Sequence, residues 1–113
     1  MASLDASAQG AAAPKQFIYV LRLVPRLHDA AAWTARDNDS VSAHFKRLQA
    51  ATQEGRVILA GRTDEPLNRT FGIVIFEARS EAEARAFMEA DPTVQDGVMV
   101  AELHPYSVAL LRK

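Results

Sequence analysis

The chain has 113 residues, of which 49% are hydrophobic and 24% charged, with a formal net charge of −1. This is the size and balance of one globular domain, and the near-neutral charge gives no reason to expect nucleic acid or an anionic membrane as a partner. The absence of cysteine excludes disulfides, thiolate catalysis and cysteine-ligated metal centres.

The N-terminal residues, 1–15, are mostly small or polar and lack the basic start and leucine-rich core of a secretory signal. We expect a disordered extension here, followed by a single domain over residues 16–113. The longest apolar run is far short of the ~20 residues that a membrane-spanning helix needs, and a cytoplasmic protein is expected.

The first regular element is a strand over residues 16–24, which are rich in β-branched and aromatic side chains. Pro25 ends it. Residues 26–39 are polar and form an unusually long connection, which is typical of a functional or mobile loop.

A helix is then expected, with Asp39 or Ser40 as its cap and Gly55 just beyond its end near residue 54. Its apolar positions follow the helical repeat, so they share one buried face: Val41, His44, Phe45, Leu48 and Ala51.

The second half of the chain repeats this alternation. Strands are expected over residues 56–60 and 70–77, with the polar loop 61–69 between them. Ser80 and Glu83 form a capping-box pattern that opens a second helix, which Asp91 and Pro92 close, because a residue before proline disfavours helical geometry. The last strand is expected over residues 98–103, with a short edge extension over 106–110.

The resulting order is β-α-β-β-α-β. Its common compact arrangement is the ferredoxin-like α+β fold, a four-stranded antiparallel sheet with both helices on one face. In this arrangement the start of the first helix and the end of the second lie at the same end of the molecule, together with both long polar loops. We therefore expect His44 and Asp91 to meet there.

The strands also predict a homodimer. In residues 17–24 and 71–76, both alternating faces of the strand are largely apolar, whereas a sheet with one wet face should alternate apolar and polar residues. The two helices cover one face, and a second copy of the chain is the economical cover for the other.

The chain resembles the YCII-related proteins, a family of dimeric α+β barrels. The resemblance extends over nearly all of residues 16–110, and the segments that carry it are the strand 17–24, His44 to Leu48, Glu54 to Gly61, Phe71 to Phe76, Ser80 to Arg85, and Ala90-Asp91-Pro92 with Gly97. It implies a ferredoxin-like subunit, a homodimer and a His44–Asp91 site in the dimer cleft. Some relatives are associated with the breakdown of aromatic compounds.

Two positions depart from the family pattern. Val41 stands where members often carry an arginine, and Arg62 follows Ala60-Gly61 where many members have proline. The first change removes a group expected to bind anions. Either Arg62 or Arg36 could replace its charge.

The two central candidates each have a structural alternative. His44 is a candidate acid–base group, because histidine titrates near pH ~6.5; the alternative is a packed histidine whose ring nitrogens bind backbone or water. Asp91 is a candidate for orienting the imidazole, and the alternative is an aspartate that makes the turn before Pro92.

Three further residues are candidates for substrate binding. Arg62 and Arg36 could each bind an acidic group, and Trp33 could form a pocket wall; solvated loop arginines and a tryptophan that anchors its loop are the alternatives. The three histidines lack the spacing of a metal site, and neither a phosphate loop nor a serine-hydrolase elbow occurs, so no metal or cofactor is expected.

The leading functional hypothesis is a cofactor-independent enzyme. His44 and Asp91 would carry out isomerisation, elimination or lactone chemistry on a small acidic or aromatic metabolite, with Arg62 neutralising oxyanion charge. The alternative is a non-enzymatic protein that binds a metabolite or another protein.

Overall fold

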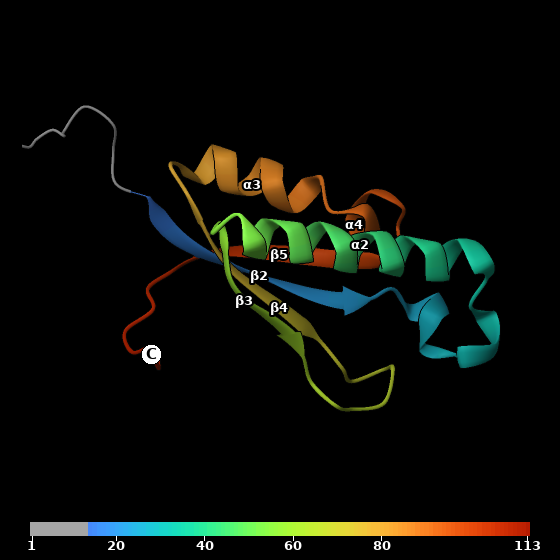
Figure 1. Ribbon diagram of the computed structural model, residues 1–113. Coiled ribbons are helices and arrows are strands. Elements are labelled where there is room, and N and C mark those ends of the chain that lie inside the picture. The colour runs from blue at the N-terminus through green and yellow to red at the C-terminus, as the bar shows by residue number, and fades with distance from the viewer. Residues whose placement is uncertain (1–13) are drawn as a thin grey trace, which may run out of the picture.

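The computed structural model describes residues 14–113 of the chain (Figure 1). The extension expected over residues 1–15 lies almost entirely outside this range. Its last residue, Lys15, already belongs to the first described strand.

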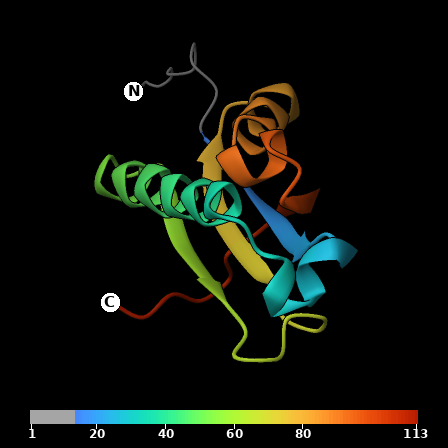
Figure 2. The same cartoon turned by 90° about the vertical axis from the view of Figure 1, so that its right-hand side faces the viewer.

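The four strands form one antiparallel sheet in the order β3-β4-β2-β5. The strands are β2 (Lys15–Leu23), β3 (Val57–Arg62), β4 (Gly72–Ala78) and β5 (Met99–Tyr106). Helices α2 (Ala35–Gln53) and α3 (Glu81–Glu89) lie side by side on one face of this sheet (Figures 1 and 2). The ferredoxin-like α+β fold predicted from the element order is confirmed.

The core lies between the sheet and the two helices. The inward side chains of β2 alternate as expected, and four of them are buried: Phe17, Tyr19, Leu21 and Leu23. Phe76 of β4 contacts Phe87 of α3, with ring centroids 4.8 Å apart. These four residues share one side of the strand because side chains at i and i+2 point the same way.

Helix α2 begins earlier than the sequence indicated. Its N-cap is Thr34, whose hydroxyl accepts from the Asp37 backbone while the Asp37 carboxylate accepts from the Thr34 backbone. The expected caps, Asp39 and Ser40, lie inside the helix. Ser40 is buried there and donates its hydroxyl to the Pro92 carbonyl oxygen. His44 therefore lies in the middle of a 19-residue helix and not near its start.

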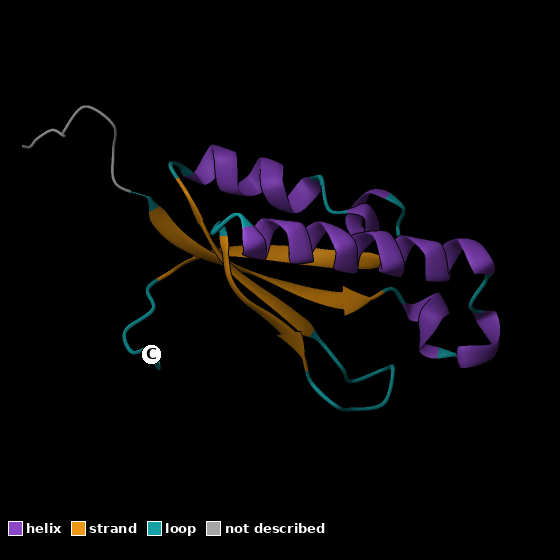
Figure 3. Cartoon of the chain, viewed as in Figure 1, coloured by secondary structure: helices purple, strands orange, loops and turns teal. Residues whose placement is uncertain are grey.

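The connection expected as one polar loop over residues 26–39 is largely helical (Figure 3). It contains the 3-10 helices η1 (Pro25–His28) and η2 (Ala30–Ala32) and the first turn of α2. Arg26 stabilises this connection by a bidentate ion pair with Asp37, in which Nη2 lies 2.9 Å from Oδ1 and Nη1 lies 3.0 Å from Oδ2. The Arg26 guanidinium and the Thr34 backbone hold the pKa of the Asp37 carboxyl well below its usual range.

The Asp91-Pro92 step also differs from expectation. Helix α3 does end just before it, at Glu89, but Asp91 is the N-cap of a further helical turn, α4 (Pro92–Gln95). Proline at the first helical position explains this, because its fixed φ suits a helix start. The Asp91 carboxylate therefore lies at the favourable, positive end of a turn rather than at the negative end of a helix.

The remaining helix and strand boundaries lie close to their predicted positions. Gly55 follows α2 with φ +86°, the left-handed conformation expected of a helix-ending glycine. Strand β5 continues to Tyr106, and the expected edge extension over residues 106–110 adds no strand beyond that residue.

The face of the sheet away from the helices has no covering element among residues 14–113, and its apolar side chains lie beside the polar Arg22, Glu102 and His104. Ile18 and Val20 of β2 and Ile73 of β4 point to this side, and Leu59 and Val100 are 45% and 59% exposed on it. We call this surface the open sheet face.

The Thr34 cap gives the first prediction. Replacing Thr34 with alanine removes the hydroxyl that accepts from Asp37, and the free energy of unfolding should fall by about 1 kcal/mol. Chemical denaturation measures the change. Ser42→Ala is the matched control, because Ser42 is exposed within the same helix, and an equal loss in both variants would contradict the assignment of the cap.

Candidate functional site

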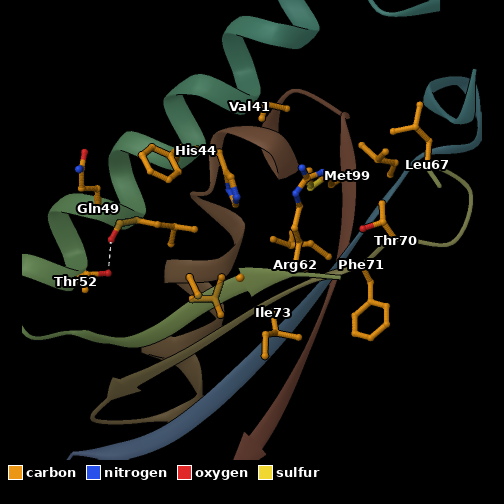
Figure 4. A pocket seen from close by; sticks show the side chains of 18 of the residues that line it. Val41, His44, Gln49, Thr52, Arg62, Leu67, Thr70, Phe71, Ile73 and Met99 are labelled. Atoms are coloured by element: carbon orange, nitrogen blue, oxygen red, sulfur yellow. Dashed lines mark hydrogen bonds between the residues drawn. The ribbon is translucent and has the colours of Figure 1, made fainter. Parts of the chain in front are cut away.

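A cavity of about 820 Å³ opens between α2 and the β3–β4 side of the sheet (Figure 4). Helix α2 forms one wall, β3 and β4 form the other, and the loop before β4 closes one end. Most of its lining is apolar: Leu21, Leu23, Trp33, Val41, Phe45, Leu48, Leu67, Phe71, Ile73, Val74 and Met99. A largely apolar cavity with few polar groups is typical of a site for a small molecule.

The structure brings His44 and Asp91 together at the inner wall of this cavity. The Nδ1 atom of His44 lies 2.8 Å from both carboxylate oxygens of Asp91. Asp91 is fully buried, whereas the His44 side chain is 16% exposed. The pair therefore has one inaccessible member and one member that reaches the cavity.

Two residues from other elements complete the surroundings of Asp91. Tyr19 donates its hydroxyl to Oδ2 at 2.7 Å, and Thr93 donates both its backbone N–H and its hydroxyl to Oδ1, at 3.0 and 2.7 Å. Tyr19 and Thr93 are themselves fully buried. The carboxylate is thus held rigidly by donors from β2 and α4 as well as by the histidine.

These donors keep the buried carboxyl ionised. Burial alone would raise its pKa, but the hydrogen bonds and charge of His44 and the hydrogen bonds of Tyr19 and Thr93 outweigh burial and lower the pKa of Asp91 to about 2. An ionised carboxylate can only accept hydrogen bonds. The Nδ1 atom of His44 must therefore carry a proton, and in the neutral imidazole Nε2 is the free base.

Arg62 faces His44 across the cavity (Figure 4). It ends β3 opposite Gly72, on the helix side of the sheet. Because Gly72 has no side chain and Ala60 is small, the long arginine side chain has room to lie along this wall. His44 and Arg62 are the only ionisable side chains in the lining, which has no carboxylate.

The remaining sequence candidates lie in different places. Trp33 lines the cavity, and its indole N–H donates to the Leu27 carbonyl at 3.0 Å, so it both forms a wall and anchors its loop. Arg36 is exposed on the first turn of α2 and does not line the cavity. Phe45, expected on the buried face of its helix, is 64% exposed at the rim.

Sequence reasoning missed Tyr19 and Thr93. In the sequence, Tyr19 belongs to a largely apolar strand, and nothing local indicates a role for its hydroxyl. A buried tyrosine hydroxyl nevertheless needs a hydrogen-bond partner, and this need indicates a nearby polar group. Thr93 follows Asp91 by two residues, which is the spacing at which an N-cap carboxylate binds the helix start. Asp91, Pro92 and Thr93 together carry that signal.

No metal site or membrane span was found in residues 14–113. No group of three or more histidine and carboxylate side chains in this range lies close enough to hold a metal ion. No helix in it is long and apolar enough to cross a membrane.

The sequence model of the YCII-related domain matches residues 19–105, and the chain belongs to this family. No match was found among curated proteins. Among solved structures, one match is 5-chloro-2-hydroxyhydroquinone dehydrochlorinase (TftG) from Burkholderia phenoliruptrix AC1100, in complex with 2,5-dihydroxybenzoquinone. It is 19% identical with a TM-score of 0.61, over 81% of this chain and 93% of that one, which supports the shared fold.

The lowered pKa of Asp91 predicts a pH-dependent stability. A carboxyl whose pKa is about 2 when folded and near the ordinary aspartate value of 3.8 when unfolded stabilises the fold above about pH 4. Its contribution, about 2 kcal/mol, is lost as the pH falls toward 2. Denaturation curves of wild type and Asp91→Asn should therefore differ at pH 7 and converge by about this amount at pH 2.

Asp96→Asn is the matched control, because Asp96 is exposed at the end of α4. Its difference from wild type should stay nearly constant over the same pH range. A constant difference for Asp91→Asn as well would show that its carboxyl is not preferentially stabilised in the folded state.

Proposed function

We propose that this protein is a cofactor-independent enzyme that transfers protons to or from a small acidic or aromatic molecule. The observation that carries this proposal is the orientation of His44: the buried carboxylate of Asp91 fixes Nδ1, and the opposite edge of the ring faces a cavity that also contains Arg62. A catalytic histidine held by a carboxylate has this arrangement.

The geometry supports a simple acid–base step. Nε2 of His44 removes a proton from a carbon or hydroxyl of the bound molecule, and the released electron pair moves onto a carbonyl oxygen or expels a leaving group. Asp91 stabilises the imidazolium that forms, and Arg62 neutralises the charge on the oxygen. The imidazolium then returns the proton to another atom or to the leaving group, so the reaction is an isomerisation, an elimination or a lactone opening.

The lining favours an anion with an apolar or aromatic body. The lining combines the Arg62 cation with the Trp33 ring and a broad apolar wall, and it has no acidic side chain that would repel an anion. The dehydrochlorinase of similar fold is described with a quinone ligand, and a hydroxylated quinone fits this description. Arg62 lines the cavity and Arg36 does not, so we assign anion binding to Arg62.

The proposed enzyme is a homodimer that pairs through the open sheet face. Exposed Leu59 and Val100, with Ile18, Val20 and Ile73 beside them, form an apolar surface that a second copy would bury. Ile73 of β4 and Phe71, just before this strand, also line the cavity. A partner on the open sheet face would therefore complete part of the cavity rim.

A non-enzymatic binding protein is the second candidate. The cavity lining contains no cysteine, serine or carboxylate that could act as a nucleophile, and Phe45 exposes an aromatic surface at the rim that suits contact with another protein. Binding without turnover separates this candidate from the enzyme.

Replacing His44 with glutamine tests the enzyme proposal. Wild type is screened for turnover of small hydroxyquinones, phenols, aromatic carboxylates and lactones. With any substrate found, kcat/KM should fall at least about 100-fold in His44→Gln, because the acid–base group is lost. Full activity in a correctly folded His44→Gln variant would refute the mechanism.

His28→Gln is the control for this change. His28 lies on η1, outside the cavity, with its Nε2 3.1 Å from the Leu23 carbonyl oxygen, and its replacement should leave kcat/KM unchanged. Thermal shift with 2,5-dihydroxybenzoquinone as the probe adds a binding readout. Binding that depends on Arg62, with no turnover of any compound, would favour the binding protein.

The dimer is tested by a charge on the open sheet face. Val100→Glu buries a carboxylate in the proposed interface and should give a monomer of 12.4 kDa where wild type has twice that mass. Light scattering after gel filtration measures both. Ala43→Glu adds the same charge on the exposed side of α2 and should remain dimeric; a monomeric wild type would disprove the interface.

A further inference from the structure

The cavity continues on both sides of the facing pair His44 and Arg62 (Figure 4). On one side, four of its apolar residues pack against the buried core cluster and form a closed end: Trp33, Val41, Leu67 and Met99. On the other side, the cavity runs between β3 and the later turns of α2, where its lining is Leu48, Gln49, Thr52, Gln53 and Ala60. We call these two parts the Trp33 arm and the Thr52 arm.

The cavity is longer than a single ring requires. A helix rises about 1.5 Å per residue, so α2 lines the cavity from Val41 to Gln53 over about 18 Å. The volume of about 820 Å³ lies in the upper part of the range of roughly 300–1,000 Å³ that is typical of sites for drug-sized molecules. A single ring between His44 and Arg62 would leave the Thr52 arm to water, which is unfavourable beside apolar walls. The shape therefore fits a longer molecule.

The strand side of the Thr52 arm is formed by small residues. Helix α2 and strand β3 run in opposite directions through the tight turn at Gly55, so the earlier residues of β3 lie opposite the later residues of α2. Ala60 precedes Arg62 by two residues on the same side of β3, and it has only a methyl group. A Cβ atom added to Gly61 would meet no other heavy atom within 4 Å. This side of the arm therefore has room for a substituent of the bound molecule.

The Thr52 arm favours an uncharged, apolar substituent. None of the residues that line it is charged, because His44 and Arg62 both lie at its inner end. Leu48 is buried in its wall, and the ring of Phe45 is 64% exposed at its rim. The hydroxyl of Thr52 donates to the Leu48 carbonyl oxygen at 2.7 Å. A hydrocarbon chain can therefore cover these apolar groups without leaving that hydroxyl donor unpaired.

We propose that the substrate is an acidic ring compound that carries an apolar substituent several carbons long. The ring lies toward the Trp33 arm, its ionised oxygen lies between His44 and Arg62, and the substituent lies along the Thr52 arm toward solvent. This inference rests on the proposed function for the position of the ring. It adds the substrate class, an alkylated hydroxyquinone or aromatic acid.

The test is binding of a series of 2-hydroxy-1,4-naphthoquinones that carry no chain or an ethyl, butyl, hexyl, octyl or dodecyl chain at the 3-position. Isothermal titration calorimetry on the full chain gives each Kd without any turnover. Each methylene that enters the Thr52 arm should lower Kd by about two- to fourfold, according to how fully it is buried. The gain should stop once the chain passes Thr52, about 12 Å from His44 along α2, and reaches solvent.

Thr52→Trp separates the Thr52 arm from other apolar surfaces of the protein. Thr52 is exposed in the free protein, and an indole there would occupy the space along which the chain lies. The ratio of the Kd without a chain to the Kd of the octyl compound should fall at least about tenfold from its wild-type value. Because it is a ratio, any change in binding of the ring itself cancels.

Ala50→Trp is the matched control. It adds the same ring on the exposed side of α2, outside the cavity lining, and should keep the wild-type ratio. Arg62→Gln tests the other end of the molecule, because it removes the charge beside the ring and leaves the Thr52 arm intact. It should raise every Kd in the series by about the same factor.

The outcomes distinguish this inference from the proposed function. A gain with chain length that Thr52→Trp removes and Ala50→Trp keeps supports the inference, even if no compound is turned over. A Kd that does not change with chain length, a wild-type ratio in Thr52→Trp, an equal loss in Ala50→Trp, or no binding by any member overturns it. Turnover of a single-ring substrate that depends on His44, together with a flat series, would keep the proposed function and overturn this inference alone.

Discussion

The buried carboxylate of Asp91 is the constraint on which the rest of the site depends. It accepts from His44, Tyr19 and Thr93, so one group connects α2, β2 and α4. The carboxyl stays ionised because these donors outweigh the cost of burial. An ionised carboxylate can only accept hydrogen bonds, so the proton of the neutral imidazole must lie on Nδ1. The free nitrogen of His44 then faces the cavity. The ferredoxin-like fold thus presents an imidazole nitrogen with a free lone pair to the cavity.

Much of the fold and the proximity of His44 and Asp91 could be predicted from the sequence, since strand alternation and helical periodicity indicate which side chains share a face. The element order β-α-β-β-α-β predicted the fold, and the fold predicted the proximity of His44 and Asp91. The sequence placed the start of α2 too late, because Asp39 and Ser40 are also suitable caps and the true cap is Thr34 with Asp37. Ser40 instead donates its hydroxyl to the Pro92 carbonyl oxygen. That contact spans 52 residues and has no local signal.

The parts of the site that escaped prediction are all tertiary. Tyr19 reads as an ordinary member of an apolar strand, and only its contact with a residue 72 positions away gives its hydroxyl a purpose. Membership of the YCII-related family accounts for the architecture, whereas the proposed chemistry depends on the residues around Asp91.

The most direct test of this account is the tautomer of His44, read from the ¹⁵N chemical shifts of its ring at a pH where the imidazole is neutral. The account predicts a proton on Nδ1, directed at Asp91, and an unprotonated Nε2 in the cavity. A ring protonated on Nε2 would contradict it, because the pair would then lack both the hydrogen bond that orients the histidine and the base that the proposed chemistry requires.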